Sequence, residues 1–543
     1  MVAERKHWHG KRGPIPKDDA KVSPKTLRNR RSLAASSVKR YGLSPLQLRA
    51  SKAEVDDIPA PRKRAPPGTP EVVLEALLAR RAKNSTWEGF KAARGGKAVY
   101  KNKIIAMEKA LTSDLAVSTT RHGAFLNGFT AIPLYLHLAQ QSHVLHQGDY
   151  PPGLLIFWDA NSMYAGKKCH LLSISLPQAK QPHQLGLQLP LGRWNGPENH
   201  SAVWKVFESM NLVHALKSAM QIHMHGKRLR LVWSPDWAAL RTILNHAPPG
   251  SELGCVFCWS MKTNWRLFGG PKGPLRVFEN FDTRCRPFLD LFASMLDIIY
   301  DPLHCCALVL THMVVHAIYF WVQQNLPAAY QAQLLGVYKT HLLQHPFFAA
   351  ESVKIGPNDW AMSNNLTKSV LFNCTFWADL STLLPRTTQG LVVQHQLVDG
   401  GAILDDPLHE YLQLLRALAV QLLAWKPLNV ATRQADCARL HALHSALGFP
   451  KERFTIAFHV FLEHYGDRLE RHGNLQGMCT EGGEHSHQRD AQIVATRKST
   501  PAHKCPIGLE CCMQDAALGL GLWRNGFWVP ANYYEDAVSL PPK

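Results

Sequence analysis

At 543 residues the chain is longer than one ordinary domain, and we expect two to four domains. Hydrophobic residues make up 46% and charged residues 19%, which excludes an intrinsically disordered protein and predicts a globular one. The net charge of +20 is concentrated at one end: residues 1–110 hold 26 Lys and Arg against 10 Asp and Glu, whereas residues 111–543 hold 35 against 31. A basic arm on a nearly neutral body predicts a polyanionic partner, most commonly nucleic acid.

Cysteine usage and hydropathy set the expected compartment. Twelve cysteines are too few for a disulfide scaffold, and residues 1–32 are too polar for a signal peptide. The longest apolar run, residues 307–322, contains two histidines and is short for a membrane span, so we expect no membrane partner. The basic cluster at residues 61–64 is a candidate nuclear-import signal, with a solvated linker as the alternative. We therefore expect a nuclear protein.

The first 67 residues are predicted to be a largely disordered, DNA-binding arm, because they are basic and lack apolar periodicity. Residues 10–17 resemble a minor-groove arm. The candidate DNA-contacting residues are Lys11, Arg12, Arg28, Arg30, Arg31, Arg62, Lys63 and Arg64. A small helical segment at 68–150, with helices at 72–83 and about 104–111, is expected to bind DNA, to dimerise or to serve as a tether.

Two strands, each followed by an acid, are predicted between residues 151 and 274. Residues 154–159 form an apolar run with Asp159 at its end, and residues 229–233 precede Asp236. Further elements expected there are a strand at 171–176 and helices at 204–220 and 237–245. Residues 275–457 are predicted to be a large helical insertion, with helices at 288–300, 305–325, 328–345, 369–384 and 407–425. Residues 458–530 and a tail at 531–543 follow it.

A zinc site is indicated by Cys255 and Cys258, whose spacing suits two thiolate ligands of a four-ligand site. The candidate partners are two histidine pairs. His312 and His316 are one helical turn apart. His459 and His464 are five apart, about 140° from facing each other on an ideal helix, and need a helix end or bend to converge. From spacing alone both pairs remain open, as does a core role for each histidine.

A magnesium site is indicated by the carboxylates. Asp159 and Asp236 after strands, with a third acid from a helix, can hold two hard cations for phosphodiester chemistry. Glu481 and Glu484 lie on one face if their segment is helical, although solvated surface glutamates are the plainer interpretation. A ribonuclease-H-like catalytic core needs Asp, Asp and Glu in this order.

Several separated motifs resemble the Transib transposases and the catalytic subunit of the V(D)J recombinase. The second aspartate, Asp236, is followed by the Cys pair at offsets of 19 and 22 residues. Residues 301–305, Asp-Pro-Leu-His-Cys, are similar to an element of that family. Two further segments are similar to that family as well: residues 458–473, which include His459 and His464, and residues 480–484, Thr-Glu-Gly-Gly-Glu. The resemblance covers roughly residues 150–530.

The resemblance implies a zinc-stapled, ribonuclease-H-like core interrupted by the helical insertion. Asp159, Asp236 and Glu484 would bind two Mg²⁺ or Mn²⁺ ions for DNA cleavage and strand transfer. One structural Zn²⁺ would be shared by Cys255, Cys258, His459 and His464. Accessory residues near the acids would be Asp301, His304 and Glu481, and a homodimer would act on paired DNA ends.

The chain departs from that family at two places. Asp159 matches only as an aspartate at a strand end. Where the family places a base-stacking tryptophan after Lys-Pro, this chain has Asn429, with Trp425 nearby. We expect a DNA transposase or recombinase-like nuclease, or a domesticated descendant. The alternatives are a non-enzymatic DNA-binding protein with the same zinc-stabilised fold and a nuclease acting on RNA.

Overall fold

A computed structural model describes eleven stretches of the chain and a few residues near position 73. They are 101–120, 123–145, 153–164, 167–180, 185–266, 272–305, 406–423, 429–448, 455–473, 475–495 and 505–528. By its contacts the chain divides into two compact units, and every described residue belongs to the unit that comprises Arg62–His341 and Lys354–Pro541. The predicted DNA-contacting residues, His312, His316 and Trp425 lie outside the described residues.

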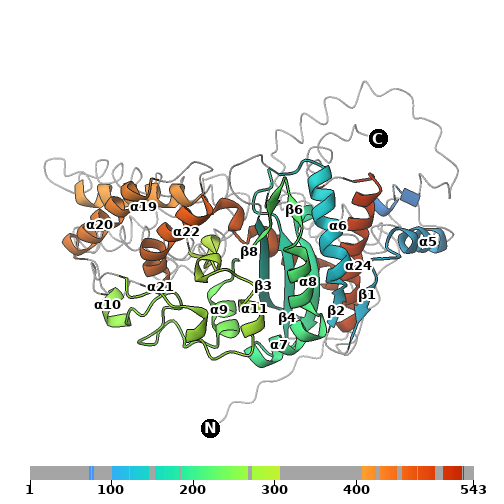
Figure 1. Ribbon diagram of the computed structural model, residues 1–543, viewed down its shortest axis with the longest axis horizontal. Helices are drawn as coiled ribbons and strands as arrows, with labels where there is room; N and C mark the ends of the chain where they lie inside the picture. Colours follow the sequence, from blue (N-terminus) through green and yellow to red (C-terminus); the bar gives the residue numbers. More distant parts are fainter. Residues whose placement is uncertain are drawn as a thin grey trace, which may run out of the picture. The chain divides into compact units, whose positions relative to one another are not determined.

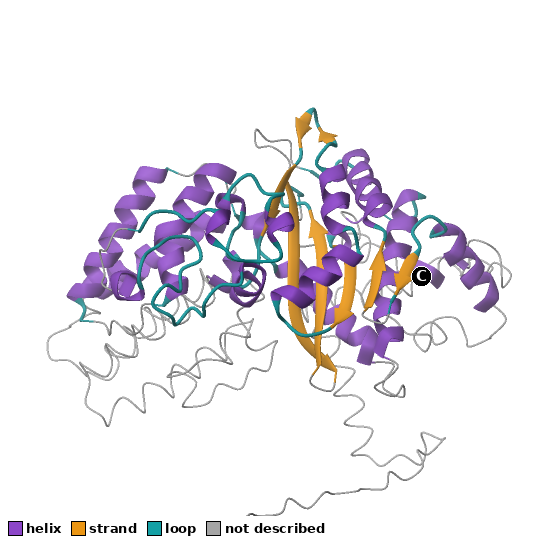
Figure 2. Ribbon diagram, turned by 60° about the horizontal axis from the view of Figure 1, so that its bottom comes forward, coloured by secondary structure: helices purple, strands orange, loops and turns teal. Residues whose placement is uncertain are grey.

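A six-stranded mixed sheet forms the centre of the described unit (Figures 1 and 2). Its spatial order is β1-β2-β5-β4-β3-β8. Neighbours are antiparallel except β3 and β8, which are parallel. An isolated parallel bridge from Trp233 to Ile298 continues the pairing beyond β8. The strands are β1 (Val117–Thr119), β2 (Gly123–Leu126), β3 (Gly153–Tyr164), β4 (Lys167–Ser175), β5 (Leu189–Asn195) and β8 (Arg230–Trp233).

Helices cover both faces of this sheet, which explains why the start of β3 is apolar at every position. Successive strand residues point to opposite faces. On one face Trp158, His170 and Trp194 stack, and Trp194 packs on Phe207 of α7 (His200–Ser209). On the other face, Phe157 contacts His487 of α23 (Glu481–Ala495).

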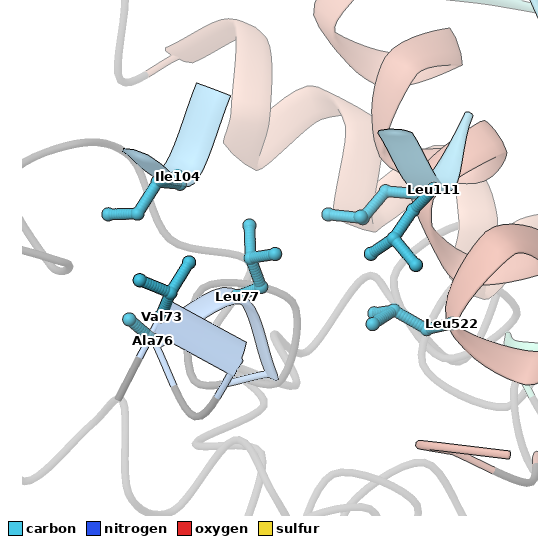
Figure 3. Close-up of a cluster of buried hydrophobic side chains, with 7 residues drawn as sticks. Val73, Ala76, Leu77, Ile104, Leu111 and Leu522 are labelled. Atoms are coloured by element: carbon cyan, nitrogen blue, oxygen red, sulfur yellow. The ribbon is translucent and has the colours of Figure 1, made fainter. Parts of the chain in front are cut away.

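Other helices complete these layers. α8 (Leu212–Ala219) packs on α6 (Gly128–Gln141) and α7, and α9 (Trp237–Leu244) contacts α7 and β3. α24 (Cys505–Arg524) contacts α23, β1, β2 and β5. Its outer side joins α5 (Lys101–Leu111) and the helical residues near position 73 in an apolar cluster (Figure 3). That cluster consists of Val73, Ala76, Leu77, Ile104, Leu111, Leu518 and Leu522.

A helical layer follows residue 405. α19 (Asp406–Leu423) packs on α20 (Val430–Ala446), with Arg439 forming a two-bond pair with Glu410 at 2.6 Å. Asn429 caps α20, because its side chain accepts from the Thr432 N–H. The chain then continues through α21 (Ile456–His459), the π turn η9 (Val460–His464), α22 (Tyr465–His472) and η10 (Gln476–Met478) to α23.

Short elements fill the remaining segments. They are the hairpin β6 (His223–Met224) and β7 (Lys227–Arg228), the short helices α10 (Lys262–Arg266) and α11 (Arg286–Leu289), and the 3₁₀ turns η4 (Leu185–Leu187), η5 (Phe278–Asn280) and η6 (Met295–Asp297). None of the helices within the described ranges is long and apolar enough to cross a membrane.

The structure corrects several expected elements. The predicted helix at 288–300 is wrong: only short turns occur there, because Ile298 pairs beside β8. Asp159 lies inside β3 rather than at its end, since the strand continues to Tyr164. The helix expected at 204–220 breaks at Asn211, which has a φ of 49°. Residues 117–119 and 123–126, expected in a separate helical segment, form β1 and β2 of the main sheet. The helices expected between 306 and 405 lie outside the described residues.

Candidate metal centres

The Cys and His residues predicted to share zinc meet in one buried group. Cys258 Sγ lies 3.4 Å from His459 Nε2, and Cys255 Sγ lies 3.5 Å from His464 Nε2. The two histidine nitrogens are 3.2 Å apart, and all four ligand atoms lie within 4.8 Å of one another. Bonds of about 2.0–2.3 Å at tetrahedral angles require ligand separations of roughly 3.3–3.8 Å. The predicted grouping is therefore confirmed, and the group could bind a structural zinc ion.

A π turn brings the two histidines together. Five residues of an α-helix place side chains about 140° apart, which would separate His459 from His464. In η9 the Tyr465 N–H instead bonds the carbonyl of Val460, five residues back. The extra residue in that turn rotates His464 onto the side occupied by His459. The sequence required a distortion here, and the structure supplies it.

The surroundings favour the ligand form of three side chains unequally: burial and Cys258 raise the pKa of the Cys255 thiol, which would therefore lose its proton only on binding a metal. Burial lowers the pKa of His464 to about 4, so its imidazole is neutral at neutral pH, as a ligand must be. Hydrogen bonds from Cys255 and both histidines lower the pKa of the Cys258 thiol. The Arg276 Nε–H donates to the carbonyls of Cys255 and Cys258, at 3.1 and 3.0 Å, and fixes the loop that carries both thiols.

Charged contacts connect this group to the sheet. Arg468 of α22 is fully buried and donates to the carbonyls of Ile298, His464 and Met295 at 3.0–3.3 Å. Arg471 forms a two-bond pair with buried Asp297, at 2.7 Å for each bond. Because Ile298 pairs with Trp233, these contacts hold α22 beside the end of β8.

Asp301 connects the end of β8 to the start of α23. Its N–H donates to the carbonyl of Pro235, at 2.9 Å, next to Asp236. Its carboxylate accepts from the Thr480 N–H and Oγ at 3.0 and 2.5 Å, and Thr480 directly precedes α23. It also accepts from the ring of His304. The position predicted to be accessory is thus a structural junction between two of the three predicted metal ligands.

The three predicted catalytic carboxylates come from separate elements that this framework holds together. Asp159 lies in β3, next to β8 in the sheet. Asp236 begins α9, and its Oδ1 accepts from the Ala239 N–H at 2.7 Å. Glu484 lies one turn into α23, whose helicity agrees with the expectation for Glu481 and Glu484. The described part of the chain has no set of these carboxylates within 4.8 Å, so they are spaced more widely than the Cys–His group.

The charge of one carboxylate nevertheless shifts the pKa of the others. Burial and the charge of Asp159 raise the pKa of Asp236 to about 6 and that of Glu484 to about 8. Burial opposes ionisation of Asp159 as well, but the neighbouring His487 ring and the charge of His304 lower its pKa to about 2.

His304 carries the balancing charge. Burial opposes protonation of its ring, but Asp301, Glu484 and Asp236 raise its pKa to about 10. Among the described residues, the protonated His304 ring therefore places a positive charge beside the acidic carboxylates.

Known proteins give no further guidance to this arrangement. No known family model matches the chain, and a comparison with curated proteins finds no match. The assignment to the transposase and recombinase family stays a prediction, as does the catalytic role of the three acids.

Two residues at the acidic cluster escape sequence reasoning. His487 lies 3.2 Å from the carboxylate of Asp159, and Arg193 contacts His487 from β5. Signals for both exist in the sequence. His487 is three residues after Glu484 and thus on the same helix face, and Arg193 interrupts an apolar strand.

Proposed function

We propose that the chain cleaves and joins DNA strands with two divalent metal ions held by Asp159, Asp236 and Glu484. The observation that carries the proposal is that these three carboxylates, 77 and 248 residues apart in sequence, lie close enough in the fold for the charge of Asp159 to raise the pKa of Asp236 and of Glu484. Holding like charges together in a buried place is costly unless a cation joins them. A spacing wider than one ion needs is compatible with two ions about 3.5–4 Å apart.

Sheet topology gives independent support. Three antiparallel strands (β5, β4, β3), a parallel fourth (β8) and a parallel bridge beyond it are compatible with a ribonuclease-H-like core to which β1 and β2 are added. In that arrangement the first acid belongs to the first strand and the second follows the fourth strand. Asp159 and Asp236 occupy these places.

The donor set suits hard cations, because all three ligands are carboxylates. When bound, the two ions would activate the attacking oxygen and stabilise the leaving oxygen of a phosphodiester. The chain's own residues hold the ligands in place: the α9 N-terminus orients Asp236, and Asp301 fixes the start of α23. His304 adds a positive charge that favours an anionic phosphate.

DNA is proposed as the substrate because the first 110 residues carry most of the excess positive charge. A homodimer and a nuclear location are proposed on the resemblance and on the basic cluster at residues 61–64.

The test is nicking of supercoiled plasmid with Mn²⁺. Asp236→Asn keeps an acceptor for the α9 cap but removes the charge, and Glu484→Gln does the same on α23. Each should reduce nicking more than about 100-fold, because each removes a ligand rather than an outer contact. Glu470→Gln, at an exposed position of α22, is the matched control and should nick like wild type. Equal nicking by all four proteins, or none by zinc-loaded wild type, would contradict the proposal. Cleavage of RNA–DNA hybrids but not of plasmid would assign the site to RNA instead.

A further inference from the structure

A chain of buried polar side chains runs across one face of the sheet, from β5 to Asp159 in β3. Asp159, Leu171 and Arg193 are in register on β3, β4 and β5, so their side chains point to the same face. α23 lies over this face, and it supplies the partners of Arg193 described below. Arg193 is completely buried, and so is His487, which is 1% exposed.

Arg193 is held in place by α23. Its Nη2 donates to the carbonyl of Ser486 at 3.4 Å and pairs with the carboxylate of Asp490. Its Nη1 lies 3.1 Å from His487 Nδ1. A buried guanidinium needs such partners, and three contacts to one helix also fix the rotation of that helix.

The contact with Arg193 determines which nitrogen of His487 carries the proton. A guanidinium has donors only, so Nδ1 must be the acceptor. The ring proton is therefore on Nε2, and Nε2 lies 3.2 Å from Asp159 Oδ2. This is a close polar contact whose angles fall short of a hydrogen bond, and Nε2 has no hydrogen-bond acceptor among the described residues. The other oxygen of Asp159 accepts from the Ala160 N–H at 2.6 Å.

We infer that His487 is a positioning residue: fixed by Arg193 as the Nε2–H tautomer, it restrains one oxygen of Asp159 through the 3.2 Å contact and so orients that carboxylate for the metal ions it would hold. This inference rests on the proposed function. Metal ligands are commonly oriented by such outer partners, whose loss lowers metal affinity about 10- to 100-fold. The Phe157 ring packs against the imidazole edge-to-face at 5.9 Å and keeps its plane fixed.

The test compares two variants that differ in the Nε2 donor. His487→Phe keeps the ring and its volume but has no donor, whereas His487→Gln places an amide donor at a similar reach. Mn²⁺ affinity, followed by loss of the free-ion paramagnetic signal in zinc-loaded full-length protein, should fall about 10- to 100-fold in His487→Phe. His487→Gln should recover most of that loss. Zinc content and the melting temperature verify that both variants fold.

The outcomes separate this inference from the proposed function. Mn²⁺ binding by wild type that Asp236→Asn abolishes supports the acidic site itself. If wild type and Asp236→Asn bind Mn²⁺ equally, the proposed function fails. If wild type binds and His487→Phe binds as tightly, the acidic site stands and the role of His487 is refuted. A loss shared equally by the Phe and Gln variants also refutes it, because a purely packing role would not distinguish a donor.

Discussion

At the level of single residues, buried arginine and histidine side chains join separate helices and strands through hydrogen bonds. Arg193, Arg433 and Arg468 are each at most 1% exposed. Arg433 donates to the carbonyls of Phe461 and Leu418 at 2.6 and 3.3 Å, and so joins α20 to α19 and to the π turn η9. Charged groups are normally assigned to the surface, and their carbonyl and side-chain partners allow these to be buried. Sequence periodicity therefore could not place them, because the partners come from segments far apart in the chain.

His444 should make stability depend on pH. Burial and the charge of His441 lower the pKa of His444 to about 3, and its Nδ1 lies 3.0 Å from the hydroxyl of Tyr411. Below about pH 6.5 His444 binds a proton in the unfolded chain but stays neutral in the folded one. Its contribution to the free energy of unfolding is therefore fully present above that pH and is lost as the pH falls. The loss is at most about 1.4 kcal/mol for each pH unit.

Melting temperatures at pH 7.5 and pH 5.5 measure this effect. Wild type should lose more between the two than His444→Asn, which cannot titrate. Zinc ligands are protonated equally in both proteins, so the difference between them isolates His444. An identical decrease in both would show that His444 contributes nothing.

At the level of elements, local pattern identified β4, β8, α9 and α19 well, because each has a regular apolar period and recognisable ends. It failed where a neighbour decides the conformation. Ile298 adopts an extended conformation because it pairs beside β8, although its segment has helical spacing. The convergence of His459 and His464 was a requirement of the zinc hypothesis, but no propensity at residues 460–464 predicts a π turn.

Close approach of α23 to the sheet depends on Gly483. A Cβ there would lie 2.6 Å from the buried ring of Phe157, whereas a Cβ on Gly466 of α22 would meet nothing within 4 Å. Gly466→Ala should therefore raise the free energy of unfolding by about 0.5–1 kcal/mol, the helix-propensity gain. Gly483→Ala has the same gain, but overpacking costs about 1–3 kcal/mol, and the residue next to it is Glu484.

Thermal melts and Mn²⁺ titrations distinguish the two alanine variants. Gly483→Ala should melt lower than Gly466→Ala and bind Mn²⁺ more weakly than wild type. Unchanged Mn²⁺ affinity in Gly483→Ala would show that the helix can shift without moving its glutamate.

For the molecule as a whole, the zinc group and the acidic cluster should depend on each other. Both draw one part from before residue 305 and one from after residue 455, and α22, Asp297 and Asp301 connect them. We expect that removing zinc with a chelator, followed by dialysis, abolishes Mn²⁺ binding at the acids, because α23 loses its anchor.

Readdition of Zn²⁺ should restore Mn²⁺ binding in the dialysed protein, and Cys258→Ser should behave like the zinc-free chain without any chelator. Mn²⁺ affinity that survives in a zinc-free protein would mean that Asp301 and Arg468 suffice to hold the acids together.

The order of the ligands along the chain has a consequence during biosynthesis. Cys258 and His459 are separated by 201 residues, which a ribosome needs about 10–40 s to add. Throughout that interval the nascent chain has two thiols without their histidines and two aspartates without their glutamate. The Cys–His group cannot close until His464 has left the ribosome, and the acidic cluster cannot close until α23 has. A truncated product ending anywhere before residue 484 would lack the third acid, so under the proposed function incomplete chains would not cleave DNA.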